Sequence, residues 1–476
     1  MCQAVRKRGL LSCYQRLEFR PKDTETRQRK IMSEDVLKAV SSTAIAEVGH
    51  DNKEIQDAIA LKGAIPPLVA LFKGKRISVQ MKGAMAVESL ASHNPFIEKA
   101  FLEKSLTKYL LKLLKAFQMD VKEQGAIALW ALAGQTLKQQ KYIAEQIGYS
   151  FIINMLLSPS AKMQYVGGEA IIALSKDSRM HQNQICEANG IAPLVHLLRI
   201  SKIAEGTLLS IIRAMESIYT EEFLMLRHIL EVSVMIICLY NIEFHCNGID
   251  ISGFIRKCGT PVSQQCIVDE NAFPILIQLL KNHPSPNIKV EVAFSLACIV
   301  LGNDVLQKDL HENEGFEYAD VFHLLHSTEK DICLRAGYAL TLFAFNIRCQ
   351  QYIILESGIM TISIFEPFLE SPIETEKAMA AFQIVEWAKV IRDVDHITLS
   401  ARGVTILVDS LYSVQTSTTV LTGNLIASLA HSRAGIPEAF TALGTVQQLC
   451  YHLYPGTEED HNQSLLGMLS YHENQG

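Results

Sequence analysis

Aromatic residues and metal-binding patterns are scarce in this chain. Only 7% of its 476 residues are aromatic although 49% are hydrophobic, so leucine, isoleucine, valine and alanine must build most of its core. The 11 cysteines include no CxxC pair and no framework spacing, which indicates free thiols in a reducing compartment. The 15 histidines show no ligand-like spacing. We therefore predict no bound metal and no cofactor.

Catalytic motifs are missing as well. The sequence contains no GxGxxG, GxxxxGKS/T, HExxH or GxSxG motif. His245 stands beside Cys246, but no second pair lies at zinc-finger distance, so we interpret the two as chance neighbours. Because no acid, base or nucleophile can be assigned, we expect that the protein is not an enzyme.

Neither positive nor negative charge is in large excess in this chain. The formal net charge of −6 argues against a nucleic-acid partner recognised by bulk electrostatics. Residues 1–32 nevertheless hold nine Lys/Arg and three Asp/Glu, a net of +6, so the remainder carries −12. We predict that 1–32 is a disordered tail, with a nuclear address or a contact to an anionic surface as the alternatives. No apolar stretch in it suggests a secretory signal, and we expect an intracellular location, in the cytoplasm with the nucleus as alternative.

The sequence does contain a short motif that recurs about every 42 residues. It stands at 63–69 (GAIPPLV), 190–195 (GIAPLV) and 271–276 (NAFPIL). A fixed period of this size is typical of a solenoid, in which each repeat buries its apolar face by stacking on its neighbours. Weaker echoes stand at Gly148, Gly315, Gly358, Gly403 and Gly444. Nine repeats are predicted to begin near Glu54, Pro95, Lys138, His181, Pro261, Asn303, Cys349, Asp393 and Ala434.

Each repeat is predicted to contain three helices. A short first helix with a Gln/Ile pattern ends at the marker glycine, which suits a left-handed cap. A proline then opens the amphipathic second helix, and a third helix rich in small residues follows, as at 125–133. Residues 34–49 read as the last helix of a further repeat. The domain prediction is a tail at 1–32, repeats at 33–218, and repeats five to nine at 261–476 with an atypical last one.

One step breaks the period, because the marker moves from 190 to 271. Residues 219–260 carry neither the glycine-proline marker nor an alanine-rich helix, so we predict a non-repeat insertion. Its apolar part, 229–240, is interrupted by Glu231, and its uninterrupted run 234–240 is far shorter than the roughly twenty residues of a membrane span. A loop, an ordered element and a membrane-associating segment all stay open for this insertion, although we do not expect membrane contact.

The repeat resembles the armadillo repeat, a three-helix unit with G-x-I-P-x-L-V entering its second helix. The resemblance implies an all-α fold, a right-handed α-solenoid of about nine three-helix armadillo repeats. The amino-acid sequence at 102–110 (LEKSLTKYL) and 163–169 (MQYVGGE) is similar to the armadillo portion of the family of ankyrin and armadillo repeat-containing proteins. That family carries ankyrin repeats upstream, whereas no TPLH box occurs here.

The resemblance also implies a concave groove, lined by third helices, for a protein or peptide partner. Nuclear import adaptors clamp peptides there with asparagines. The aligned positions here are small or apolar, so recognition of that kind is not expected: Ser89, Ala131, Ala173, Ser217, Cys298, Leu342 and Ser428. Glu169, Arg213 and Asn424 stand one turn earlier and would set the charge preference, or only keep the groove wet.

Two functional hypotheses remain. The first is an interaction scaffold that buries a partner segment along the groove. The alternative is a targeting or transport adaptor, nuclear or membrane-proximal, addressed by 1–32 or 219–260. A separate basic stripe is predicted on one face of the second helix of repeat two, either as a dock for an acidic partner or as an ordinary solvated face: Lys104, Lys108, Lys112 and Lys115.

Overall fold

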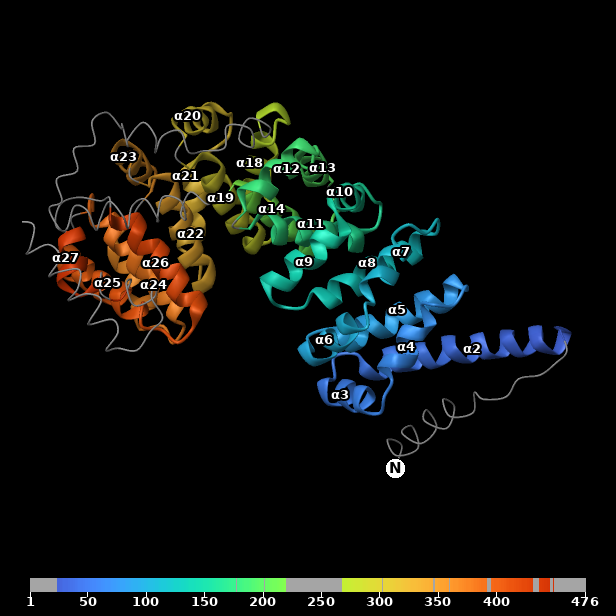
Figure 1. Cartoon of the computed structure of the whole chain (residues 1–476). Helices are drawn as coiled ribbons and strands as arrows, with labels where there is room; N and C mark the ends of the chain where they lie inside the picture. The colour runs from blue at the N-terminus through green and yellow to red at the C-terminus, as the bar shows by residue number, and fades with distance from the viewer. Residues whose placement is uncertain are drawn as a thin grey trace, which may run out of the picture. The chain divides into compact units, whose positions relative to one another are not determined.

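The computed structural model describes residues 24–176, 178–200, 202–219, 268–301, 303–345, 347–358, 360–391, 395–430, 436–445 and 448. Within these residues every regular element is a helix (Figure 1). They form two compact units. The first unit contains Met1–Leu174 and Lys202–Ile211, and the second contains Ser175–Ser201 and Ile212–Gly476.

The first unit begins with a long helix and continues with repeats one to three. Its helices are α2 (Thr24–Gly49), α3 (Lys53–Leu61), α4 (Ile65–Leu71), α5 (Ile77–Ala91), α6 (Pro95–Glu103), α7 (Thr107–Leu113), α8 (Met119–Ala133), α9 (Leu137–Ile147), α10 (Tyr149–Leu156) and α11 (Ala161–Ser175). The third helices pack in chain order, with α5 in contact with both α2 and α8. Figure 1 shows α4 lying beside α2 and α5 in blue.

The second unit continues the pattern. Its helices are α12 (Arg179–Glu187), α13 (Ile191–Leu198), α14 (Glu205–Tyr219, which begins in the first unit), α18 (Phe273–Asn282), α19 (Pro286–Val300), α20 (Asp304–Glu312), α21 (Tyr318–Leu325), α22 (Lys330–Phe343), α23 (Arg348–Ser357), the 3₁₀ helix η1 (Ile362–Glu370), α24 (Glu374–Trp387), α25 (His396–Ser410), α26 (Thr416–Ala430) and α27 (Ile436–Ala442). Here α22 packs between α19 and α24, and α24 contacts α26. The α-solenoid predicted from the period is therefore confirmed.

The repeat boundaries agree closely with the sequence. Six predicted starts fall within two residues of the first helices α3, α6, α9, α12, α20 and α23. The starts at Pro261, Asp393 and Ala434 lie outside the described residues. Most of the insertion at 219–260, from residue 220 on, also lies outside them, as do 1–23 of the predicted tail. Residues 24–32 of that tail are helical, and α2 begins at Thr24 rather than at 34. The reason is that this segment is rich in strong helix formers such as Glu, Arg, Gln and Lys.

The link between first and second helix is left-handed in the first six repeats, but glycine does not always provide it. At Gly358, which was predicted as such a cap, φ is −174° and the backbone is extended. Gly63, Gly148 and Gly315 have φ values of 79°, 82° and 95°, as predicted for the marker. In three other repeats a non-glycine residue takes this conformation: Ser105, Asn189 and Asn271. Gly190 itself lies at φ −75° and caps α13, so the marker was assigned one position too late there. Asparagine tolerates the left-handed region because its side chain bonds locally.

Repeat eight differs from the three-helix prediction. A single helix, α25, occupies the place expected for its first and second helices, and Gly403 lies inside it. Gly403 does not take a positive φ, so the helix continues through it. A Cβ at Gly403 would lie 3.0 Å from both the Ala381 carbonyl oxygen and a Val385 methyl. The glycine is therefore needed for the close approach of α24 and α25, not for a turn.

Buried glutamines near the starts of the first helices join consecutive third helices, and we call them the glutamine rungs. The Gln56 amide donates to the carbonyls of Gly49 at 3.0 Å and Ser89 at 2.9 Å, which belong to α2 and α5. Gln182 donates in the same way to Ser175 and Ser217, at 3.0 and 3.1 Å. The last carbonyls of a helix have no partner within it. Each rung therefore satisfies two such ends and fixes the stacking of neighbouring repeats.

The apolar segment at η1 belongs to the repeat core. No single helix among those described is long and apolar enough to cross a membrane; only α23 and η1, bent by 92°, would qualify if joined. The apolar residues of η1 are buried in the core, namely Ile362, Phe365, Phe368 and Leu369.

Candidate functional site

The third helices place the predicted groove residues at one repeating position. Each of the seven aligned residues is the thirteenth of its helix, from Ser89 in α5 to Ser428 in α26. Their exposure differs from the prediction, however. Ala131 and Leu342 are half-buried, whereas the other five are buried: Ser89, Ala173, Ser217, Cys298 and Ser428.

Two of the buried members join neighbouring third helices. The Ser89 hydroxyl donates to the Ala46 carbonyl at 2.6 Å, and the Ser217 and Ser175 hydroxyls lie 2.6 Å apart. Ser428 donates to Asn424 one turn earlier, at 3.0 Å. A large charged side chain at Ala173, which is 1% exposed, would disturb folding before it could test binding. These five residues lie beneath the predicted groove surface and are not exposed on it.

The residues one turn earlier are more accessible. Glu169 and Asn424 are half-buried, and Arg213 is exposed. The same position holds Phe294 in α19 and Tyr338 in α22, both half-buried. We call Arg213, Phe294 and Tyr338 with the charged residues beside them the third-helix surface of the second unit.

A network of charges lies on this surface. The Arg213 guanidinium donates from Nε and Nη2 to the two carboxylate oxygens of Glu291, at 3.0 and 3.3 Å. Arg335 from α22 donates to the same carboxylate and lies 3.7 Å from Asp331. Glu291 is only 3% exposed, so two arginines from different helices enclose it. Paired guanidinium groups are what allow a carboxylate to stay ionised when it is buried.

A second carboxyl group completes the network. Burial, followed by the neighbouring Glu291 carboxylate, raises the pKa of Glu216 to about 8, against the opposing effect of Arg213 and Arg335. Glu216 is therefore protonated at neutral pH and can share a hydrogen bond with Glu291. Burial also raises the pKa of the Cys298 thiol well above its usual value, so this thiol is not a nucleophile.

Aromatic rings continue the surface across consecutive third helices. The Phe294 and Tyr338 rings stack with centroids 5.6 Å apart, and Tyr338 meets Phe382 of α24 edge-on at 5.9 Å. Rings in this arrangement attract each other and are fixed by packing, so the half-buried Phe294 and Tyr338 present a rigid apolar strip that rests on the buried Phe382. Sequence reasoning missed it because each ring is an isolated residue in its own helix. The available signal was an aromatic at the ninth position of α19, α22 and α24.

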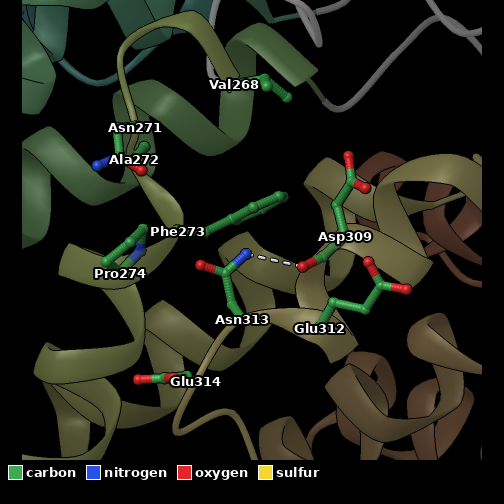
Figure 2. A pocket seen from close by; sticks show the side chains of 9 residues that line it. All are labelled: Val268, Asn271, Ala272, Phe273, Pro274, Asp309, Glu312, Asn313 and Glu314. Carbon is green, nitrogen blue, oxygen red and sulfur yellow. Dashed lines mark hydrogen bonds between the residues drawn. The ribbon is translucent and has the colours of Figure 1, made fainter.

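A cavity of about 640 Å³ lies elsewhere in the second unit, between the start of α18 and the end of α20 (Figure 2). Figure 2 shows the Phe273 ring extending toward Asp309 and Asn313. The Asn313 amide donates to the Asp309 carbonyl at 2.7 Å, which fixes this end of α20. None of its lining residues is among the predicted site residues. In the described ranges, no group of three or more His, Cys, Asp or Glu is arranged to hold a metal ion.

The basic stripe is exposed, but it is not on one helix as predicted. Only Lys108 and Lys112 belong to α7, which ends at Leu113. Lys104 caps the end of α6, and Lys115 follows the end of α7. The left-handed Ser105 separates the two helices and breaks the periodicity between 104 and 108. All four side chains nevertheless face solvent.

The fold and this surface define an armadillo-type repeat protein without assigned catalytic groups. No family model matches the chain. Over 285 residues, 60% of its length, the chain is 80% identical to the human ankyrin and armadillo repeat-containing protein. Over 282 residues, 59% of its length, it is 67% identical to the mouse protein of that name. The resemblance seen in the sequence is therefore confirmed.

The extent of these similarities is limited. The matched residues make up 18% of the human protein and 17% of the mouse protein, so the chain spans less than a fifth of these relatives. An engineered protein of known crystal structure shares the fold over 90% of this chain and 93% of its own, with a TM-score of 0.56 and 20% sequence identity.

Proposed function

We propose that this chain is a non-catalytic interaction scaffold that binds a segment of a partner protein along its third helices. The observation that carries the proposal is the third-helix surface of the second unit. There a stacked aromatic pair lies next to an exposed guanidinium that Glu291 already holds in place. Rigid aromatic rings and arginines are the side chains that dominate binding energy in protein interfaces, because little entropy is lost when they are covered.

The expected mode of binding is burial of apolar side chains from the partner. The thirteenth positions contain no asparagine, so a row of side-chain amides to bind a peptide backbone is not part of this proposal. A partner segment would instead cover the rings of Phe294 and Tyr338 and the half-buried Leu342. The arginine network would add hydrogen bonds at one end. The proposed contact centres on the position one turn before the thirteenth, where Arg213 was predicted to line the groove, and it includes Leu342 from the thirteenth positions.

Selection from a phage-displayed library of random peptides on the intact chain tests the proposal. The double variant Phe294→Ser/Leu342→Ser removes apolar area from the surface in α19 and α22. The matched control, Gln278→Ser/His323→Ser, changes two exposed residues on α18 and α21 of the same repeats. We expect peptides that bind the control normally and the first variant about tenfold more weakly, since a tenfold change is about 1.4 kcal/mol.

Circular dichroism and thermal melting would confirm that both variants fold. The proposal is wrong if every selected peptide binds the two folded variants with equal affinity.

A further inference from the structure

Four exposed lysines of the first unit lie at the end of α6, along α7 and just after α7, and we call Lys104, Lys108, Lys112 and Lys115 the lysine face. Within the described part of the chain, none of the four forms an ion pair. The second helices of the first unit contain no Asp or Glu at all, because α4 reads IPPLVAL, α7 TKYLLKL and α10 YSFIINML. The positive charge of α7 is therefore not compensated by its own layer.

The second unit handles the same layer differently. Lys281 of α18 lies 3.5 Å from Glu317 and 3.7 Å from Asp320 of the next repeat. Arg402 of α25 pairs with Glu366 and Glu370 of η1. Basic side chains on comparable helices are thus neutralised internally there. The open charge on α7 is a property of this repeat and not of the fold.

Aromatic rings orient the lysine face without neutralising it. The Lys108 and Lys112 ammonium groups lie 5.1 and 5.5 Å from the centroid of the Tyr109 ring. The Lys115 ammonium group lies 5.7 Å from that of Phe151 in α10. A ring face attracts a cation through its quadrupole and leaves the net charge unchanged. Three ammonium groups are therefore gathered over two rings, and they repel one another until an anion binds.

Exposed apolar side chains lie at the edge of the lysine face. Phe117, two residues after Lys115, is fully exposed, and Leu157 after α10 is 59% exposed. The Ser158 hydroxyl lies 3.6 Å from the Met119 sulfur, so the end of α10 reaches the start of α8 just beyond Phe117. A fully exposed phenylalanine offers apolar area whose burial by a partner would favour binding. The surface thus combines positive charge with an apolar edge.

We propose that the lysine face docks an acidic segment of another protein whose apolar side chain covers Phe117. Carboxylates spaced along a helix or a strand can meet Lys108 and Lys112, which lie one helical turn apart. Exposed carboxylates of Glu103 and Asp120 bound the face at both ends. A narrow segment fits between them, whereas a flat anionic membrane would meet them together with the lysines. This docking site is independent of the third-helix surface.

The same peptide library, selected on the intact chain, tests this inference. The variant Lys108→Glu/Lys112→Glu/Lys115→Glu reverses the lysine face. The control, Lys53→Glu/Lys62→Glu/Lys99→Glu, makes an equal charge change at exposed lysines of α3 and α6. We expect a class of peptides rich in Asp and Glu that binds the control normally and the reversed face roughly tenfold or more weakly. Their affinity should fall as salt is raised, and Phe117→Ser should weaken it further.

Three results would overturn the proposal. The library could yield no acidic peptides, or acidic peptides that bind the reversed face as tightly as the intact one. Alternatively, only vesicles of phosphatidylserine and phosphatidylcholine could sediment with the protein in a lysine-dependent manner, which would assign the face to membranes. Peptides lost in Phe294→Ser/Leu342→Ser but kept in the lysine variant would support the third-helix surface alone, so the two proposals fail separately.

Discussion

The two units bury negative charge in different ways. In the first unit, Glu98 occupies the place of a glutamine rung, is 3% exposed, and receives one hydrogen bond, from Gln139 at 3.2 Å. In the second unit, Glu291 is equally buried but is enclosed by Arg213 and Arg335. The first carboxyl group is tolerated by a raised pKa, with burial as the main cause. The second is tolerated because two guanidinium groups pair with it.

This comparison indicates which positions of the repeat can hold a buried carboxylate. The glutamine rungs carry the stacking, so a carboxylate at that position works against the fold. Glu291 lies in a third helix, at a place where side chains of three successive repeats meet. A charge network therefore destabilises the fold less there than at a glutamine rung. Gly134 adds a detail to the first case, because it lies at φ 61° and a Cβ there would collide with the Glu98 carboxylate. The carboxyl group of Glu98 therefore fits only because residue 134 has no side chain.

The largest expected effect comes from placing a glutamate at a glutamine rung of the second unit, as Glu98 stands in the first. Gln182→Glu would place a carboxylate against the Ser175 and Ser217 carbonyls that the amide now binds, in a site that is 0% exposed. Losing two donated hydrogen bonds and burying a charge should lower the free energy of unfolding by about 3 kcal/mol. Urea denaturation measures this value.

Gln182→Met is the control for that change, because it removes the hydrogen bonds without adding a charge. We expect it to destabilise the chain by less than Gln182→Glu does. Equal effects of the two variants would show that rungs act by volume alone, and the contrast with Glu98 would then lose its electrostatic basis.

A smaller effect is expected from titration of the charge network in the second unit. The folded-state pKa of Glu216 is raised from 4.5 to about 8, so its stabilising contribution is complete below pH 4.5 and is lost as the pH rises through 8. Solvent around the network reduces the loss to about 2 kcal/mol between pH 4.5 and pH 9. Hydrogen exchange of α14 and α19 against pH measures it locally.

Two variants separate the causes of that pH dependence. Glu216→Gln removes the titrating group and should abolish the dependence. Glu291→Gln removes the neighbouring charge but leaves the burial, so it should shift the midpoint of the transition to lower pH without abolishing it. An unchanged midpoint in Glu291→Gln would mean that burial alone raises the pKa.

Much of the frame was predictable from sequence because it depends on local chemistry. Helix ends, left-handed links and first-turn prolines are decided by neighbouring residues, and six repeat starts were found to within two residues. Even the errors are local: Asn189 takes the left-handed conformation in place of Gly190, and Gly403 keeps a helical backbone inside α25.

The surface was predicted less well because it depends on stacking. Whether the thirteenth residue of a third helix is open depends on the next repeat, so Ala173 is buried while Ala131 is half-buried. The Arg213–Glu291–Arg335 network joins residues separated by 78 and 44 positions, and no local pattern announces it. The signal that could have found it was a glutamate within the otherwise apolar α19.

The smallest effect, with the opposite sign, is expected from repairing the exceptional rung of the first unit. Glu98→Gln replaces a buried carboxyl group with the amide found in the other rungs. Because burial raises the folded-state pKa of Glu98, its carboxyl contributes stability that is present below pH 4.5 and lost as the pH rises through the raised value. The amide stays neutral at every pH, so the variant does not undergo this loss. The variant should therefore be more stable by about 1 kcal/mol at pH 7.

Below pH 4.5 the advantage of Glu98→Gln should disappear, since a protonated carboxyl group and an amide are both neutral there. Glu103→Gln, at an exposed residue of the same helix, provides the control and should change stability little at either pH. Urea denaturation of the three proteins at both pH values measures the difference. A gain that persists at low pH would come from the added hydrogen-bond donor rather than from removal of the charge, and the two units would then differ in hydrogen bonding and not in how they bury charge.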